Sequence, residues 1–276
     1  MEQDGDNFLL FFVRKFVFGE KIAFQHNPLC YRFLVGSSLI GNLLKKKQTL
    51  RDTQGDYFSG HNRFLGKKAE DYAKQAYEDE IIPGKFFMKS QDFPFICSAP
   101  DFLMQTEDKE IQLLEIKSGG DKREAQQNFG CQRTLMQVLS SLEVFNLDKA
   151  VLYGVERNDE KDFCKYHDHK EIQRENIFFK NRRKIIAGYV AYLQVFFKEI
   201  YDIEMTEELK KALLELIDSR VPKRAVKRPP PTLELLRKQT LTDRKQKKRR
   251  MCPKPSNMSA PHGLGYHIYI AQEPKK

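Results

Sequence analysis

Three residues near the middle of the chain combine acids and a base at a spacing that suits phosphate chemistry. Asp101 follows Pro100, and Glu115 and Lys117 stand two residues apart in the apolar run EIQLLEIK. Residues two apart on a strand project from the same face, so both side chains share one face of the predicted strand. A half-buried charge costs several kcal/mol unless it is paired or holds a metal. These charges therefore need a partner.

The partner that fits best is a divalent cation. Because Pro100 cannot donate to a sheet ladder, we expect Asp101 at a strand end beside the face of Glu115. Two carboxylates and the main-chain carbonyl of Ile116 supply the hard oxygen ligands that Mg²⁺ prefers, with positions left for water and a phosphate oxygen. An ammonium at Lys117 would orient water or stabilise the charge that builds on a phosphate. The sequence thus predicts a Mg²⁺ or Mn²⁺ site.

A structural interpretation of the same residues stays open at this point. Asp101 is compatible with capping a turn after proline, and Glu115 and Lys117 with the exposed face of an edge strand. Leu113 favours the site, because it shares their face and an open strand more often carries polar residues there.

The elements around these residues have an α/β pattern. Short apolar runs predict strands over 93–98, 110–117 and 150–155. Helical spacing over 122–146 predicts one crossover helix between the last two strands, which makes a βαβ unit.

Helical periodicity also predicts helices over 39–47, 64–78 and 181–201. Residues 7–18 are apolar without a deciding period, and the stretch around 164–169 is expected to be a loop.

Pro100-Asp101 and the later Glu115-Ile116-Lys117 resemble the signature of the PD-(D/E)XK nuclease superfamily. The stretches VGSSLIGNLL and GKKAEDYAKQAYE are similar to two helices of its YqaJ-like or lambda-exonuclease-like branch. The resemblance implies a restriction-endonuclease-like core with a central mixed sheet flanked by helices. It also implies that Glu70 supports the metal and that a glutamine completes the site. We favour Gln132, with Gln137 as the alternative.

The resemblance implies a metal-dependent deoxyribonuclease that hydrolyses phosphodiester bonds, most similar to a DNA-end-processing exonuclease of recombination or repair. Its substrate would be DNA, and a single-strand annealing protein would be a partner. A noncatalytic DNA-binding or scaffold protein of the same fold and an RNA-processing nuclease remain alternatives, since fold does not settle function.

Charge divides the chain into two parts. Up to Val221 there are 33 Lys or Arg against 35 Asp or Glu, and from Pro222 onward 15 against 3. We therefore predict a nuclease-like domain over 1–221 and a basic, proline-rich, mostly disordered tail over 222–276. The tail's densest cations are expected to bind nucleic acid, to act in nuclear import or to form a solvated linker; they are Lys245, Lys247, Lys248, Arg249 and Arg250.

Cysteine usage and the N-terminal run indicate the compartment. The five cysteines show neither CxxC pairs nor disulfide-like spacing, which favours a reducing environment. The apolar run after the acidic start is broken by Arg14 and Lys15, so we expect neither a signal peptide nor a membrane span. The expected location is the nucleus or the cytoplasm.

Overall fold

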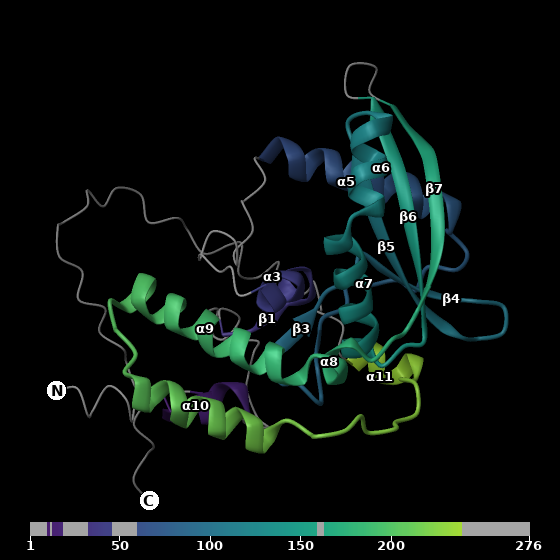
Figure 1. Ribbon diagram of the computed structural model, residues 1–276. Coiled ribbons are helices and arrows are strands. Elements are labelled where there is room, and N and C mark those ends of the chain that lie inside the picture. The colour runs from purple at the N-terminus through teal and green to yellow at the C-terminus, as the bar shows by residue number, and fades with distance from the viewer. Residues whose placement is uncertain (1–9, 12, 19–32, 46–59, 159–162, 239–276) are drawn as a thin grey trace, which may run out of the picture. The chain divides into compact units, whose positions relative to one another are not determined.

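Figure 1 shows the computed structural model of the chain. The structure describes residues 10–11, 13–18, 33–45, 60–158 and 163–238. The tail cations from Lys245 to Arg250, for which nucleic-acid binding is predicted, lie outside the described residues.

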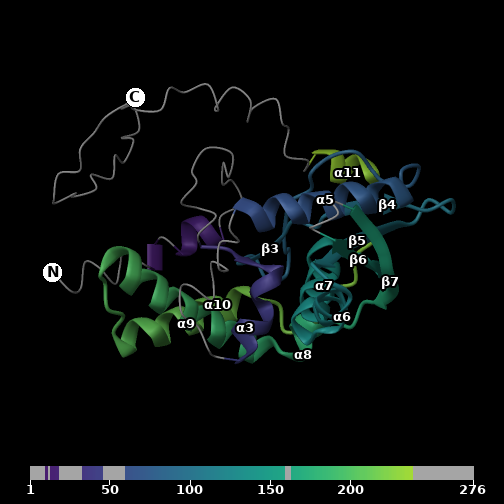
Figure 2. The same ribbon diagram turned by 90° about the horizontal axis from the view of Figure 1, so that it is seen from above.

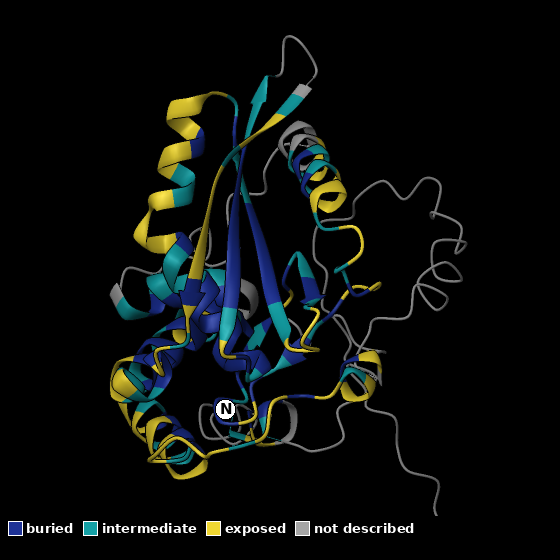
Figure 3. Ribbon diagram, turned by 90° about the vertical axis from the view of Figure 1, so that its right-hand side faces the viewer, coloured by how far each residue is buried: buried dark blue, intermediate teal, exposed yellow. Residues whose placement is uncertain are grey.

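The larger sheet is mixed, as predicted, and its strand order is β4-β5-β6-β7. Strand β5 (Ile111–Gly119) pairs in parallel with β6 (Lys149–Asn158), while β4 (Phe102–Gln105) and β7 (Phe163–Gln173) join the two edges in antiparallel fashion. The prediction of a loop around 164–169 is wrong. That stretch forms part of the exposed edge strand β7 (Figure 3).

Helices cover both faces of this sheet. Helix α5 (Gly60–Ala76) packs on one face, and α6 (Lys122–Gly130) and α7 (Gln132–Phe145) pack on the other (Figure 2). Leu114 and Ile116 belong to the cluster under α5, whereas Leu113 belongs to the larger core under α7. The alternation expected of a two-sided buried strand therefore holds along β5.

The crossover between β5 and β6 is two helices rather than the one predicted over 122–146. Cys131 interrupts it in an extended conformation with φ −74° and ψ 146°, and its Sγ accepts a hydrogen bond from the Thr134 N–H at 3.4 Å. Helix α6 has its own cap, because Asp121 Oδ1 accepts from the Glu124 N–H at 2.7 Å. The break changes the helical phase of every residue after Cys131.

A second, smaller mixed sheet has the order β1-β3-β2, so the described chain contains two sheets where one was predicted. Its strands are β1 (Val35–Gly36), β2 (Met88–Lys89) and β3 (Ile96–Ser98). The predicted helix at 39–47 appears as a 3₁₀ turn η2 (Ser37–Leu39) followed by α3 (Ile40–Lys45).

The remaining helices complete the main core. They are η1 (Val13–Val17), α8 (Ile177–Lys180), α9 (Arg182–Tyr201), α10 (Glu207–Arg220) and α11 (Leu233–Lys238). The predicted long helix at 181–201 is confirmed as α9. Its fully buried Tyr189 stacks on Phe95 at 4.1 Å between ring centroids and donates its hydroxyl to the Phe33 carbonyl at 2.8 Å.

The described part of the predicted tail, residues 222–238, packs on the domain. Arg228 donates both guanidinium NH groups to the buried Asp92, at 2.8 and 2.5 Å. Asn146 Nδ2 donates to the Pro229 carbonyl at 2.8 Å, and Leu236 is fully buried in the main core. The boundary predicted at Val221 therefore lies too early, because a bidentate ion pair and an apolar anchor hold the following residues.

None of the described helices combines the length and apolar character that crossing a membrane requires.

We expect truncation after Val221 to destabilise the domain. It would leave Asp92 buried without its guanidinium and remove Leu236 from the core. Leaving a buried charge without its ion-pair partner costs about 3 kcal/mol or more. The free energy of unfolding, measured by urea titration, should fall by at least that amount, and truncation after Leu241 should leave it unchanged.

The pair Arg228→Ala and Arg224→Ala provides a matched point control, since Arg224 is exposed and makes no ion pair with a described residue. Equal unfolding midpoints for these two variants would contradict the proposed anchoring by Arg228.

Candidate active site

Strand register brings Asp101 and Glu115 together. Phe102 pairs with Leu114 in the antiparallel β4–β5 ladder, so Asp101, one residue earlier, lies beside Glu115 on the same face. The ladder stops there because Pro100 has no N–H. The free Ile116 N–H instead donates to Asp101 Oδ2 at 2.8 Å. Since the N–H and C=O of a strand residue point to the same edge, the Ile116 carbonyl also faces Asp101.

Glu115 is buried with only one of its oxygens satisfied. Its side chain is 2% exposed, and Oε1 accepts from Lys117 Nζ at 2.7 Å and from Gln137 Nε2 at 2.5 Å. Oε2 is also buried, and no group among the described residues donates a hydrogen bond to it. A buried carboxylate oxygen without a partner is costly, so this atom is the strongest indication of a bound cation.

The charges of the site shift one another's pKa values. Burial, and next the Glu115 charge, raise the pKa of Asp101 well above its usual value, against the opposing effects of Lys117 and the Ile116 N–H. Burial acts to lower the pKa of Lys117, but Glu115 and Asp101 outweigh it and raise that pKa. Lys117 therefore stays charged at neutral pH, and the two carboxylates repel each other.

Glu70 lies on α5, at the opposite face of β5, and acts on the site through its charge. Burial raises its pKa, Lys67 and Lys85 oppose that rise, and Glu115 adds to it. The structure thus brings Glu70 within electrostatic range of Glu115 and Asp101. The sequence analysis did not single out Lys67 and Lys85. Lys67 lies on α5 and Lys85 in the loop before β2, so both are distant in sequence from Asp101 and Glu115 and belong to no motif.

The glutamine that meets Glu115 is Gln137, whereas the sequence analysis favoured Gln132. Gln132 is the first residue of α7 and is exposed. Gln137 lies five residues later on the same helix, about 140° further around its axis, and its amide donates to Glu115. Spacing along the chain to the next strand, on which the choice of Gln132 rested, does not decide which face of α7 meets Glu115.

Close packing at the end of β5 fixes the start of α6 next to Lys117. A Cβ on Gly119 would lie 2.1 Å from the Ala125 nitrogen, so only glycine allows this approach. Asn128 Nδ2 donates to the Ser118 carbonyl at 2.9 Å and ties α6 to the same strand end.

The residues present fit a divalent cation. Asp101, Glu115 and the Ile116 carbonyl offer oxygens on one side of β5, and one of these oxygens is buried without a partner. Among the residues that the structure describes, no three His, Cys, Asp or Glu side chains form a group that holds a metal by itself. The donor set is thus two carboxylates and a carbonyl, which suits a cation that keeps waters, as Mg²⁺ does.

Comparisons with known proteins give only distant likenesses. No protein-family model matches the chain, and no curated protein does. Among solved structures, an alkaline exonuclease (LHK-Exo) from Laribacter hongkongensis is similar with a TM-score of 0.42 and 14% identity, over 69% of this chain and 95% of that chain. A phage-related exonuclease from Haemophilus somnus 129PT gives 0.41 and 13%, over 61% and 96%. Both TM-scores lie below 0.5, so the argument for function rests on the site itself.

We expect Gly119→Ala to destabilise the protein, because the added methyl overlaps the α6 backbone and forces α6 away from Lys117. Overpacking of this kind costs about 1–3 kcal/mol or more. Differential scanning calorimetry would show a lower Tm. Gly66→Ala is the matched control: nothing lies within 4 Å of the added carbon, and a helix-interior alanine gains up to ~1 kcal/mol. An equal drop in both variants would contradict the close approach at Gly119.

Proposed function

We propose that this chain is a metal-dependent deoxyribonuclease that hydrolyses the phosphodiester bonds of DNA. The observation that carries the proposal is Glu115: a buried carboxylate beside Asp101, with Oε1 held by Lys117 and Gln137 and Oε2 without a partner. A site built only for stability would satisfy both oxygens. This one leaves Oε2 without a donor among the described residues, in the same carboxylate whose Oε1 accepts from the Lys117 ammonium.

In this proposal Asp101, Glu115 and the Ile116 carbonyl would hold Mg²⁺ or Mn²⁺. When bound, such an ion supplies Lewis acidity toward a phosphate oxygen and toward water. It would also offset the burial and the weaker repulsion between acids that raise the pKa values of Asp101 and Glu70.

The chain's own residues have separate roles. Lys117 keeps its proton, because Glu115 and Asp101 raise its pKa, and its ammonium can donate to a phosphate oxygen as negative charge builds there. Gln137 is a positioning residue, since its amide fixes the rotamer of Glu115. Glu70 adds negative charge on the far side of β5, which strengthens the attraction for a cation.

The finer parts of the proposal rest on the sequence resemblance: processing of DNA ends as an exonuclease, a role in recombination or repair, and an annealing protein as partner. A location in the nucleus or cytoplasm likewise stays a prediction.

We expect purified full-length protein to degrade end-labelled duplex DNA with Mg²⁺ or Mn²⁺ and to be inactive with EDTA. Glu115→Gln should lower turnover at least ~10³-fold, since the buried oxygen loses its charge, and Lys117→Ala should lower it at least ~10²-fold. Glu110→Gln, an exposed residue just before the same strand, is the matched control. Single-stranded DNA and RNA in parallel lanes separate the alternative nuclease classes.

Metal binding gives a second readout that needs no turnover. Mg²⁺ or Mn²⁺ should raise the Tm of the wild type and of Glu110→Gln but not of Glu115→Gln, because a ligand stabilises only a state that binds it. Cleavage that persists in EDTA, or in Glu115→Gln, would refute the site assignment.

Variants of the two glutamines test whether Gln137, which contacts Glu115, or Gln132, which the sequence favoured, acts in the site. Gln137→Ala should lower turnover about 10–100-fold, the usual cost of losing a group that orients a metal ligand. Gln132→Ala should stay within about twofold, since its side chain is exposed. Single-turnover rates at saturating metal measure both variants, and the reverse order would place the functional glutamine at the helix start.

A further inference from the structure

A groove lies between α9 and the end of α10, on elements that do not carry the candidate active site. Its volume is about 860 Å³, and Ile186, Leu214 and Val221 line it together with Arg183, Arg220 and Lys223. Helix α9 packs on α3, α8 and α10, whereas the site is built on β4, β5, α5 and α7. The groove and the site therefore share no residue.

Unpaired cations gather around this groove. Three exposed cations that line it, Arg183, Arg220 and Lys223, make no ion pair or hydrogen bond with another described residue. Three more stand within a few residues of them along the chain and are exposed and equally unpaired among the described residues: Lys184, Arg224 and Lys227. Other cations of the same helices are paired, such as Arg182 with Asp218 and Lys210 with Glu207. Unpaired like charges repel one another, so a polyanion that covers them relieves that repulsion.

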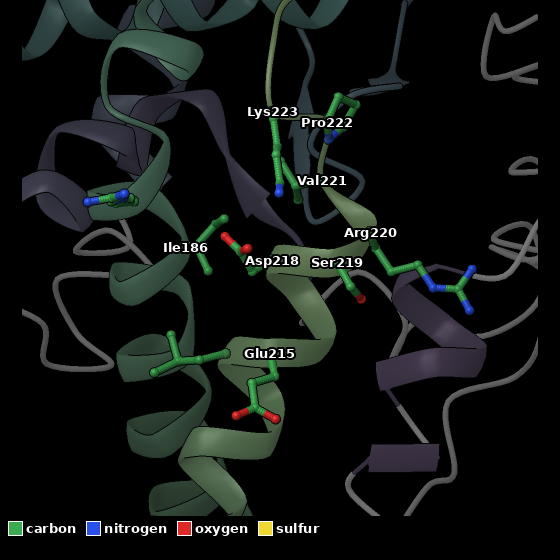
Figure 4. A pocket seen from close by; sticks show the side chains of 10 residues that line it. Ile186, Glu215, Asp218, Ser219, Arg220, Val221, Pro222 and Lys223 are labelled. Carbon is green, nitrogen blue, oxygen red and sulfur yellow. The ribbon is translucent and has the colours of Figure 1, made fainter.

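The acids of the groove do not cancel this charge. Asp218 is already engaged by Arg182, and Glu215 is the other carboxylate in the lining. Figure 4 shows the Lys223 side chain directed toward the groove and the Arg220 side chain extending to the other side of the end of α10. The cations thus lie on both sides of the end of α10, as they would along a backbone that crosses it.

We propose that this surface, called the α9–α10 cationic surface and made of the six cations named above, binds the sugar-phosphate backbone of DNA apart from the active site. The inference rests on the proposed function for the choice of DNA as the polyanion. Arg and Lys side chains are among the groups that contact phosphates, and Arg183, Arg220 and Lys223 line the groove. Leu214 is the groove's exposed large apolar residue at 37%, which is little for an apolar protein interface.

The sequence that follows supports the same occupant. Beyond Lys238 the chain adds Arg244, Lys245, Lys247, Lys248, Arg249 and Arg250. The cationic surface therefore leads along the chain into the densest basic run. The surface and this basic run would be two attachment points for one duplex. Such a pair raises the apparent affinity, because the second contact becomes intramolecular.

The test measures binding without cleavage. Fluorescence anisotropy of the full chain in EDTA, at several salt concentrations, compares labelled duplexes of about 8 and about 30 base pairs, the longer reaching roughly 100 Å at 3.4 Å per pair. The surface variant is Arg183→Gln/Arg220→Gln/Lys223→Gln. The control, Lys109→Gln/Lys149→Gln/Lys170→Gln, removes the same charge from the β4–β5 turn and from strands β6 and β7.

We expect the surface variant to bind the longer duplex at least ~10-fold more weakly and to lose about one unit of salt slope per cation removed. The control should change the slope by less than about one unit, and both variants should keep the wild-type Tm. Turnover of the 8-base-pair duplex with Mg²⁺ should be the same in all three proteins.

Equal losses in surface and control variants would overturn the inference, because net charge alone would then explain binding. Unchanged binding by the surface variant would also overturn it, and would point to an acidic protein as occupant. Failure of the proposed function is seen separately, as cleavage that survives Glu115→Gln.

Discussion

One buried carboxylate, Glu115, is the feature on which the rest of the site depends. It lies in the second strand of a mixed sheet, covered on both faces, where an isolated charge is costly. Lys117 and Gln137 satisfy one of its oxygens and leave the other to a group that the chain itself does not supply. Asp101 stands next to it because a proline ends the β4 ladder at that residue. Each neighbour therefore sets either the charge or the orientation of this single group.

The surrounding layers hold this arrangement through small polar contacts. Ser37 donates to Ser98 at 3.2 Å, Ser98 donates to Ser141 at 2.9 Å, and Ser141 donates to the Gln137 carbonyl at 2.9 Å. This buried chain links the first turn after β1, the end of β3 and helix α7. A shift of the smaller sheet would therefore move Gln137, the residue that orients Glu115. Buried networks of this kind stabilise a structure only when every member is satisfied.

The basic residues after Val221 have two physical roles, and amino-acid composition alone does not distinguish them. Arg228 is half-buried and neutralises Asp92 in the core. Lys223, Arg224 and Lys227, a few residues earlier, are exposed and remain available to an external anion. The same run of cations thus anchors the fold at one residue and presents charge to solvent at the next.

The sequence by itself determined the local features. The apolar run around Glu115, the proline before Asp101 and the 3.6-residue period of α9 each act within a few residues, so the strand, the strand end and the helix could be predicted from residue types. It also indicated which acids and which lysine converge, since strand periodicity places Glu115 and Lys117 on one face.

Tertiary structure alone decided the rest. The face that α7 turns toward β5 brings Gln137 rather than Gln132 to Glu115, and neither that face nor the break at Cys131 has a clear local signal in the sequence. The ion pair between Asp92 and Arg228 joins residues 136 positions apart and moved the domain boundary past Val221. The edge strand β7 gains its hydrogen bonds from β6, so its own residues did not predict it. These outcomes depend on partners distant in sequence, which periodicity and composition do not register.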